Sequence, residues 1–97
     1  MRKYGKRDGN HQQIVSELRD AGFGVRDTAD LGDGFGDIIV GTRGRNWLFE
    51  IKDPSRPLSA RKLTDEELKF HVSWPGQINI IETAEQAIKI ITGANHG

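Results

Sequence analysis

The chain has 97 residues, of which 35% are apolar, and its 14 basic and 14 acidic side chains leave a formal net charge of zero. This length holds one compact domain with a modest core, and the balanced charge gives no overall preference for a nucleic-acid partner. The lack of cysteine excludes disulfides and thiolate zinc sites, which leaves oligomerisation as the way to reinforce so small a domain. No apolar run approaches the roughly 20 residues that span a bilayer, so we expect a cytoplasmic protein with no membrane partner.

The N-terminal part is expected to form an arm, a helix and a short strand. Residues 1–9 are polar, basic and glycine-containing, which is typical of a flexible arm. Apolar residues at helical spacing predict a helix over residues 10–21, ended by Gly22. Phe23 and Val25 indicate a short strand, and turn-forming residues indicate a loop over 30–36. The domain proper is expected over residues 10–93, with a tail over residues 94–97.

A β-hairpin is predicted in mid-chain, with strands over residues 35–40 and 46–52 and a tight turn over residues 41–44. Side chains alternate along a strand, so Trp47, Phe49 and Ile51 share one face. Glu50 and Lys52 share the other face. The apolar face is expected to pack in the core, which leaves an acid and a lysine side by side on the opposite face.

The C-terminal part is predicted to add a helix, a strand and a second helix. Thr64 and Glu67 have the spacing of a capping box, which predicts a helix over residues 65–73. An apolar run predicts a strand over residues 78–81, and Thr83 begins a last helix that stops before Gly93. The element order is therefore αβββαβα. We expect an α/β fold with a mixed central sheet flanked by helices.

The hairpin is also the predicted active site, because it brings Asp37 next to Glu50 and Lys52. Two carboxylates in one cleft repel each other unless a cation lies between them, and oxygen ligands favour Mg²⁺ or Mn²⁺ over zinc. Asp37, Glu50 and the backbone carbonyl of Ile51 are the candidate metal ligands. Lys52 is expected to hold an attacking water or to stabilise charge developing at phosphorus. Asp37, Glu50 and Lys52 together indicate a catalytic site for phosphodiester hydrolysis. The plainer interpretation is a Glu50–Lys52 ion pair on an exposed sheet, worth less than about 1 kcal/mol.

These residues resemble a known superfamily. Gly36-Asp37 followed by Glu50-Ile51-Lys52, after an N-terminal helix, is similar to the PD-(D/E)XK nucleases, whose core has the order αβββαβ. Over nearly its whole length the chain also resembles stand-alone VRR-NUC domains. The motifs that carry this resemblance are Asp8-Gly9-Asn10, Leu18-Arg19-x-x-Gly22, Val40-Gly41, Lys62-Leu63-Thr64, Phe70-His71 and Trp74-x-Gly76. The resemblance implies a restriction-endonuclease-like fold. It also implies a homodimeric, Mg²⁺- or Mn²⁺-dependent endonuclease of phages and related elements, acting in the bacterial host cytoplasm on branched DNA such as Holliday junctions.

Three positions differ from the pattern that the resemblance implies. Gly36 stands where the superfamily usually has proline, and residues 10–13 lack the metal-supporting glutamate that related resolvases carry near the start of this helix. Asn10 either orients water or phosphate there, or caps the helix. Near the start of the next helix, where the family often has a glutamine, this chain has Glu66, Glu67 and Leu68, and we expect Glu67 to cap the helix first and to act in the site second. His71 either reaches the substrate backbone or packs as a structural residue.

Cations cluster around the predicted site. The candidates to grip DNA phosphates are Arg43, Arg45, Arg56, Arg61 and Lys62. Clustered charges are also found on ordinary solvated surfaces, so this feature alone decides nothing. Two further hypotheses stay open: a nuclease of looser specificity that acts on flaps, ends or plain duplex, and a catalytically silent DNA-binding module of the same fold.

Overall fold

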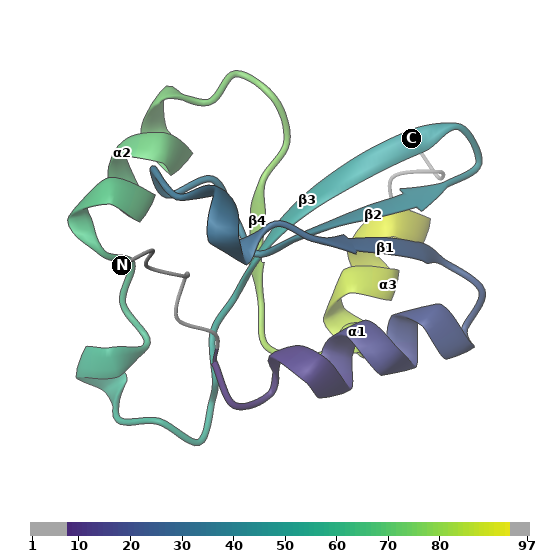
Figure 1. Ribbon diagram of the computed structural model, residues 1–97, viewed down its shortest axis with the longest axis horizontal. Helices are drawn as coiled ribbons and strands as arrows, with labels where there is room; N and C mark the ends of the chain where they lie inside the picture. The colour runs from purple at the N-terminus through teal and green to yellow at the C-terminus, as the bar shows by residue number, and fades with distance from the viewer. Residues whose placement is uncertain (1–7, 94–97) are drawn as a thin grey trace.

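The computed structural model describes residues 8–93, which form a four-stranded sheet with helices around it (Figure 1). The elements are α1 (His11–Asp20), β1 (Gly24–Asp27), β2 (Ile38–Thr42), β3 (Arg45–Ile51), α2 (Asp65–Ser73), β4 (Asn79–Ile81) and α3 (Ala84–Gly93), with short 3₁₀ turns η1 (Ala29–Leu31) and η2 (Leu58–Ala60). The strands lie in the order β1-β2-β3-β4; the first three are antiparallel, and β4 runs parallel to β3. The predicted element order and the mixed sheet are confirmed.

The ends of the chain are described only in part. Residues 1–7 of the predicted arm and the tail over 94–97 lie outside the described residues. Asp8 and Gly9, which we had placed in the arm, join the folded domain instead. The His11 N–H donates to the Asp8 carbonyl at 3.0 Å, and the Gly9 Cα lies so close to Asp53 that an added Cβ would stand 3.0 Å from its carboxylate.

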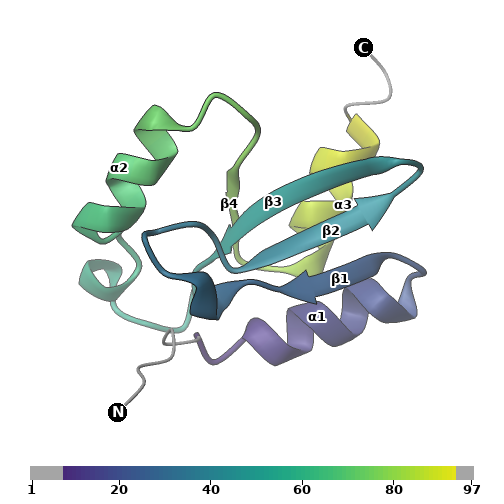
Figure 2. The same cartoon turned by 45° about the horizontal axis from the view of Figure 1, so that its top comes forward.

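The core lies between the sheet and the pair α1 and α3, which lie side by side against one sheet face (Figures 1 and 2). Helical spacing in α1 places Ile14, Val15 and Leu18 on one buried stripe. The other buried apolar side chains of the core are Ile38, Val40, Phe49, Ile51, Ile81, Ala84, Ala87 and Ile91. Each fully buried large side chain stabilises the fold by about 1.5–3 kcal/mol relative to exposure. None of the helices within residues 8–93 is both long and apolar enough to cross a bilayer.

The hairpin turn is tighter than we predicted. Thr42 pairs with Arg45, so β2 and β3 continue to a two-residue turn in which Arg43 and Gly44 have φ values of 51° and 77°. Two consecutive positive φ angles are typical of the type I′ turns that join twisted antiparallel strands. At the other end, β2 begins at Ile38 rather than at residue 35, because Phe35 leaves the sheet to contact Phe70 of α2 at a ring-centroid distance of 5.4 Å.

Helix α2 stands away from the core beside the loop that precedes β2 (Figures 1 and 2). Its predicted bounds and its capping box are confirmed: Thr64 accepts from the Glu67 N–H at 3.2 Å, and Glu67 accepts from the Thr64 N–H at 2.8 Å. Stacked Phe70 and Trp74 rings fasten the helix to Phe35. Gly34 approaches so closely that an added Cβ would lie 2.4 Å from the Glu66 carbonyl oxygen. The loop and the first turn of α2 therefore fit only with glycine at this position.

Candidate active site

Glu50 and Lys52 lie at the C-terminal end of β3, on the face opposite Phe49 and Ile51, as strand alternation predicts. Both are buried, with 2% and 7% of the residue exposed. The exposed surface ion pair that the Glu-x-Lys spacing also allowed is therefore not present. A charged pair inside the protein needs further partners, because burying charge without hydrogen bonds is costly.

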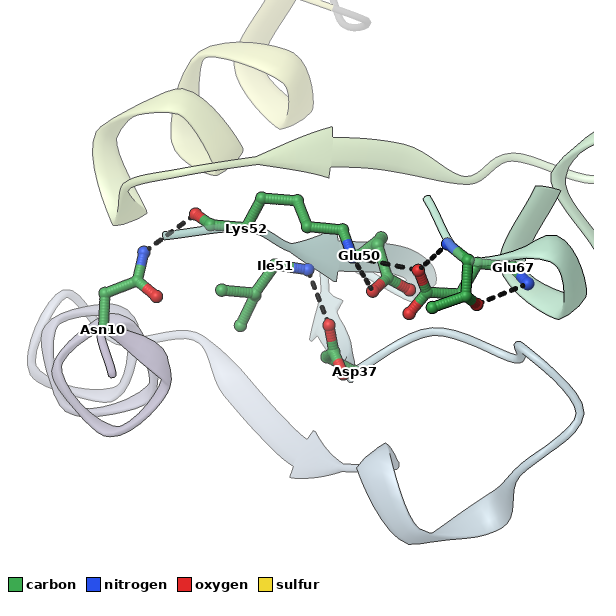
Figure 3. Close-up of polar contacts among 7 residues, drawn as sticks. Asn10, Asp37, Glu50, Ile51, Lys52 and Glu67 are labelled. Atoms are coloured by element: carbon green, nitrogen blue, oxygen red, sulfur yellow. Dashed lines mark hydrogen bonds and ion pairs between the residues drawn. The ribbon is translucent and has the colours of Figure 1, made fainter. Parts of the chain in front are cut away.

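Asp37 directly precedes β2 and lies beside these two residues (Figure 3). Its N–H donates to the Phe49 carbonyl at 2.8 Å, and its Oδ2 accepts from the Ile51 N–H at 2.7 Å. These two bonds extend the antiparallel pairing and fix the carboxylate against β3. The N–H and C=O of one strand residue point to the same side of the strand. The Ile51 carbonyl therefore also points toward Asp37, as expected for the proposed ligand set.

Gly36, next to Asp37, explains one departure from the family pattern. Its φ of 116° is outside the range of proline, and an added Cβ would lie 2.9 Å from the Leu48 Cδ1. The Thr28 hydroxyl donates to the Gly36 carbonyl at 2.9 Å. This chain therefore reaches Asp37 through a backbone conformation that only glycine adopts easily.

Lys52 contacts two carboxylates. Its Nζ lies 2.9 Å from Glu67 Oε1 and 3.7 Å from Glu50 Oε2 (Figure 3). Burial opposes the charge on Lys52, but the hydrogen bond and charge of Glu67 and the charge of Glu50 raise its pKa above the ordinary value. Burial also acts against ionisation of Glu67, yet hydrogen bonds from Glu50, Thr64 and Lys52 lower the pKa of Glu67. The expectation that Glu67 caps α2 is confirmed, and the same carboxylate also holds the lysine.

Glu50 is the acid whose ionised form is disfavoured by its surroundings in the site. Burial raises its pKa to about 10, together with the charge of Asp37 and the hydrogen bond and charge of Glu67. Glu50 therefore carries a proton at neutral pH and donates it toward the neighbouring carboxylates. A buried acid forced to keep its proton by other acids is a feature of functional sites.

The site opens into a cavity of about 650 Å³. Its walls include Asp37, Glu50, Lys52 and Glu67 together with a residue that sequence reasoning missed, Asp8. Burial raises the pKa of Asp8, opposed by the charge of Lys52 and assisted by that of Asp37. Asp8 lies just before α1, near the helix start at which the sequence has no carboxylate. The available signal was its place in the Asp8-Gly9-Asn10 motif, although the arm was predicted to extend through residue 9.

The donor set was tested for its fit to a divalent cation. Among residues 8–93, no three carboxylate, imidazole or thiol groups are gathered into a ready-made metal cage. Mg²⁺ usually keeps several waters and needs only one or two protein carboxylates. Asp37 and Glu50 supply two, the Ile51 carbonyl lies on the same side of β3 as Asp37, and a cation would offset the burial and the neighbouring acids that raise the pKa of Glu50. The residues therefore fit Mg²⁺ or Mn²⁺ with part of its water shell.

Asn10 does not cap α1 with its side chain, so the helix-cap alternative for this residue is wrong. It occupies the N-cap position, but its Nδ2 donates to the Lys52 carbonyl at 3.1 Å and to the Glu82 carbonyl at 2.9 Å (Figure 3). Its Oδ1 is buried and finds no hydrogen-bond partner in the described part of the chain. Asn10 thus joins the start of α1, the end of β3 and the segment before α3, and it fixes the backbone of Lys52.

His71 lies one turn after Glu67 and is half-buried. Burial lowers the pKa of His71, the charge of Glu67 acts to raise it and that of Lys52 to lower it. Its Nε2 is buried and has no hydrogen-bond partner within residues 8–93. This position fits the structural interpretation of His71 better than a contact with substrate.

The predicted phosphate-binding cations divide into three groups. Arg56 and Lys62 line the cavity of Asp37 and Glu50, and Arg61 lines a neighbouring cavity. Arg43 and Arg45 lie at the hairpin tip, at the opposite end of β3 from Lys52. The fold therefore does not bring these last two to the site.

Comparisons with known proteins agree with this architecture. No family model matches the chain, and no curated protein matches it. A solved structure described as a VRR_NUC domain is similar, with 25% sequence identity, 87% of this chain and 92% of that chain covered, and a TM-score of 0.60. The sequence-based fold prediction is thereby confirmed: this chain has the helices and four-stranded mixed sheet of a VRR_NUC domain, a likeness that implies a nuclease of the PD-(D/E)XK type.

Proposed function

We propose that the protein is a Mg²⁺- or Mn²⁺-dependent endodeoxyribonuclease that hydrolyses phosphodiester bonds in branched DNA as a homodimer. The observation that carries the proposal is the meeting of Asp37, Glu50 and Lys52, from two paired strands, at one open cavity. This is the arrangement that phosphodiester hydrolysis needs: acids for a metal and a cation near the reacting phosphorus.

Asp37, Glu50 and the Ile51 carbonyl are the groups that would hold the metal. When bound, the metal supplies Lewis-acid polarisation of the scissile phosphate and lowers the pKa of water. Glu50 must give up its proton to take part, and the Ile51 N–H keeps the Asp37 carboxylate oriented. Asp8 is a further carboxylate at the same cavity, and we assign it a supporting role there in place of the missing helix acid.

Lys52 provides the positive charge that the protein itself brings to the reaction. Its raised pKa keeps the ammonium protonated throughout the physiological range. Glu67 holds the ammonium at 2.9 Å, which limits its rotamers and directs the remaining N–H donors. A fixed ammonium beside the carboxylates stabilises negative charge that grows on phosphate oxygens.

The choice of DNA as substrate is supported by the cations that line the cavity, Lys52, Arg56 and Lys62, and by the likeness to a nuclease domain. The choice of a branched substrate and of a homodimer comes from the family resemblance. A two-fold dimer would place two sites to cut two strands of a four-way junction symmetrically.

The decisive test is cleavage of a labelled four-way junction, a flap and plain duplex by the wild-type protein, Lys52→Ala and Lys52→Gln in Mg²⁺ and Mn²⁺. Both variants should bind DNA and lose cutting, whereas Lys69→Ala, an exposed lysine on α2, should cut normally. Circular dichroism verifies folding, and light scattering measures the oligomeric state. Undiminished cutting by Lys52→Gln would refute the assignment. Equal cutting of all three substrates would support a nuclease of looser specificity.

A catalytically silent DNA-binding module is the second candidate, and the absence of a ready-made metal cage among residues 8–93 favours it. Mn²⁺ titration by calorimetry separates the two. The nuclease requires Mn²⁺ binding that Asp37→Asn abolishes, whereas a silent module shows no binding that depends on Asp37.

A further inference from the structure

A second cavity, of about 450 Å³, shares Lys52 with the carboxylate cavity. Its walls come from three segments: β4 contributes Ile80, the loop after β3 contributes Arg61, and α3 contributes Lys89 and Ile90. We call the space that these four residues line the β4-edge groove. Lys52 lines both cavities, so a polymer bound at the carboxylate cavity that continues past Lys52 would enter this groove.

Strand register places Ile80, one wall of the groove, on the sheet face that carries Glu50. Ile80 pairs with Glu50 in the parallel β3–β4 ladder, so the two side chains lie on the same face. Ile80 is 47% exposed, although Ile81, its neighbour on the opposite face, is fully buried. Among the described strands β4 is one of the two edges of the sheet. The surface that carries Glu50 therefore continues over the exposed Ile80 and round the β4 edge to Lys89 and Ile90 of α3, the helix that packs against the opposite face.

The charges of the groove favour an anion. Lys52, Arg61 and Lys89 line the groove together with one carboxylate, that of Glu82, and Lys52 is already paired with Glu67 and Glu50. Lys89 has only a weak partner, Glu85 at 4.0 Å, and both side chains are more than three-quarters exposed. The Arg61 Nε is buried and has no hydrogen-bond partner among the described residues. Arg61 and Lys89 therefore keep hydrogen-bonding and charge capacity that the described residues do not use.

We propose that the β4-edge groove binds the nucleotide that adjoins the scissile phosphodiester. Arg61 and Lys89 would hold its phosphate, and Ile80 and Ile90 would contact its sugar and base. Cations above an apolar floor match a nucleotide, which joins an anion to a largely apolar body, and the volume lies within the roughly 300–1,000 Å³ range of small-ligand sites. This proposal rests on the proposed function, because it takes the carboxylate cavity as the place of cutting.

The test combines Lys89→Gln with a series of DNA substrates. Each substrate carries one neutral methylphosphonate, placed at a different position around the cut. Lys89→Gln should weaken DNA binding by up to about fivefold at low salt and reduce the slope of log K against log salt by about one. One methylphosphonate, at the phosphate next to the cut, should weaken binding to the wild type more than binding to Lys89→Gln, in which only Arg61 still holds that phosphate. Ile80→Ser should weaken binding without changing the salt slope. Lys69→Gln is the matched control, because Lys69 lines neither cavity.

The outcomes separate the two proposals. A wild-type protein that cuts DNA while Lys89→Gln and Ile80→Ser bind it normally overturns the groove proposal alone. A protein that neither binds nor cuts DNA overturns both proposals. If the two substitutions instead alter the mass in solution and leave DNA affinity unchanged, the groove is a contact between subunits and the proposal is wrong.

Discussion

Replacement of Glu50 by glutamine should change how stability depends on pH. In the folded protein Glu50 keeps its proton up to a pKa of about 10, whereas in the unfolded chain it ionises near its ordinary value of 4.5. Between these values unfolding releases a proton, so the free energy of unfolding falls as pH rises. The contribution of Glu50 is fully present below about pH 4.5 and is lost progressively toward pH 10.

The magnitude follows from the linkage of one proton. A full proton corresponds to about 1.4 kcal/mol per pH unit, hence about 3 kcal/mol between pH 6 and 8. Because Glu50 is only 2% exposed, solvent screening reduces this value little. Glu50→Gln keeps the size of the side chain and removes the titration. Relative to the wild type, the variant should therefore gain about 3 kcal/mol of stability over this interval.

Urea denaturation at pH 6, 7 and 8 in metal-free buffer measures the difference. Burial lowers the pKa of His71, and because this residue is common to both proteins its effect cancels in the comparison. Glu85→Gln, an exposed acid on α3, is the control and should differ from the wild type by a constant amount. A difference between Glu50→Gln and the wild type that stays constant from pH 6 to 8 would show that Glu50 is already ionised, and the reasoning about the site would be wrong.

Two further predictions concern the metal and Asn10. Mn²⁺ must displace the Glu50 proton, so Mn²⁺ affinity should rise nearly tenfold per pH unit between pH 6 and 8. Calorimetry in buffers of different ionisation enthalpy should detect one released proton. An affinity that does not depend on pH would contradict this prediction. Asn10→Ala removes two hydrogen bonds and should cost about 2 kcal/mol in urea denaturation. If Asn10 also positions Lys52, kcat should fall more than KM rises, and a change in stability with normal kcat would limit Asn10 to a structural role.

The sequence predicts most of the fold because the informative signals are local. Alternation along β3 separates Phe49 and Ile51 from Glu50 and Lys52, and the spacing of Thr64 and Glu67 defines the start of α2. The strand ends were less predictable. Phe35 has a strong strand preference, but tertiary contact with Phe70 removes it from β2, which illustrates how packing overrides local propensity.

The site was predictable in its members but not in its energetics. Residue spacing indicated that Asp37 and Glu50 meet, whereas the burial of Glu50 and Lys52 depends on how α2 and the loop over 53–63 cover the sheet. The contacts of Asn10 with the Lys52 and Glu82 carbonyls join residues 42 and 72 positions apart, and no local pattern encodes them. Asp8 was missed for the same reason, because its place at the cavity is set by tertiary folding.

The double use of Glu67 affects how this protein can be engineered. The Glu67 carboxylate caps the first turn of α2 and also binds the Lys52 ammonium at the end of β3. These two elements therefore form one functional unit, although 15 positions separate Lys52 from Glu67. A chimera that exchanges α2 alone would move the lysine anchor even if every β3 residue stayed in place. Transplants between related domains should therefore carry the segment from β3 through α2 intact.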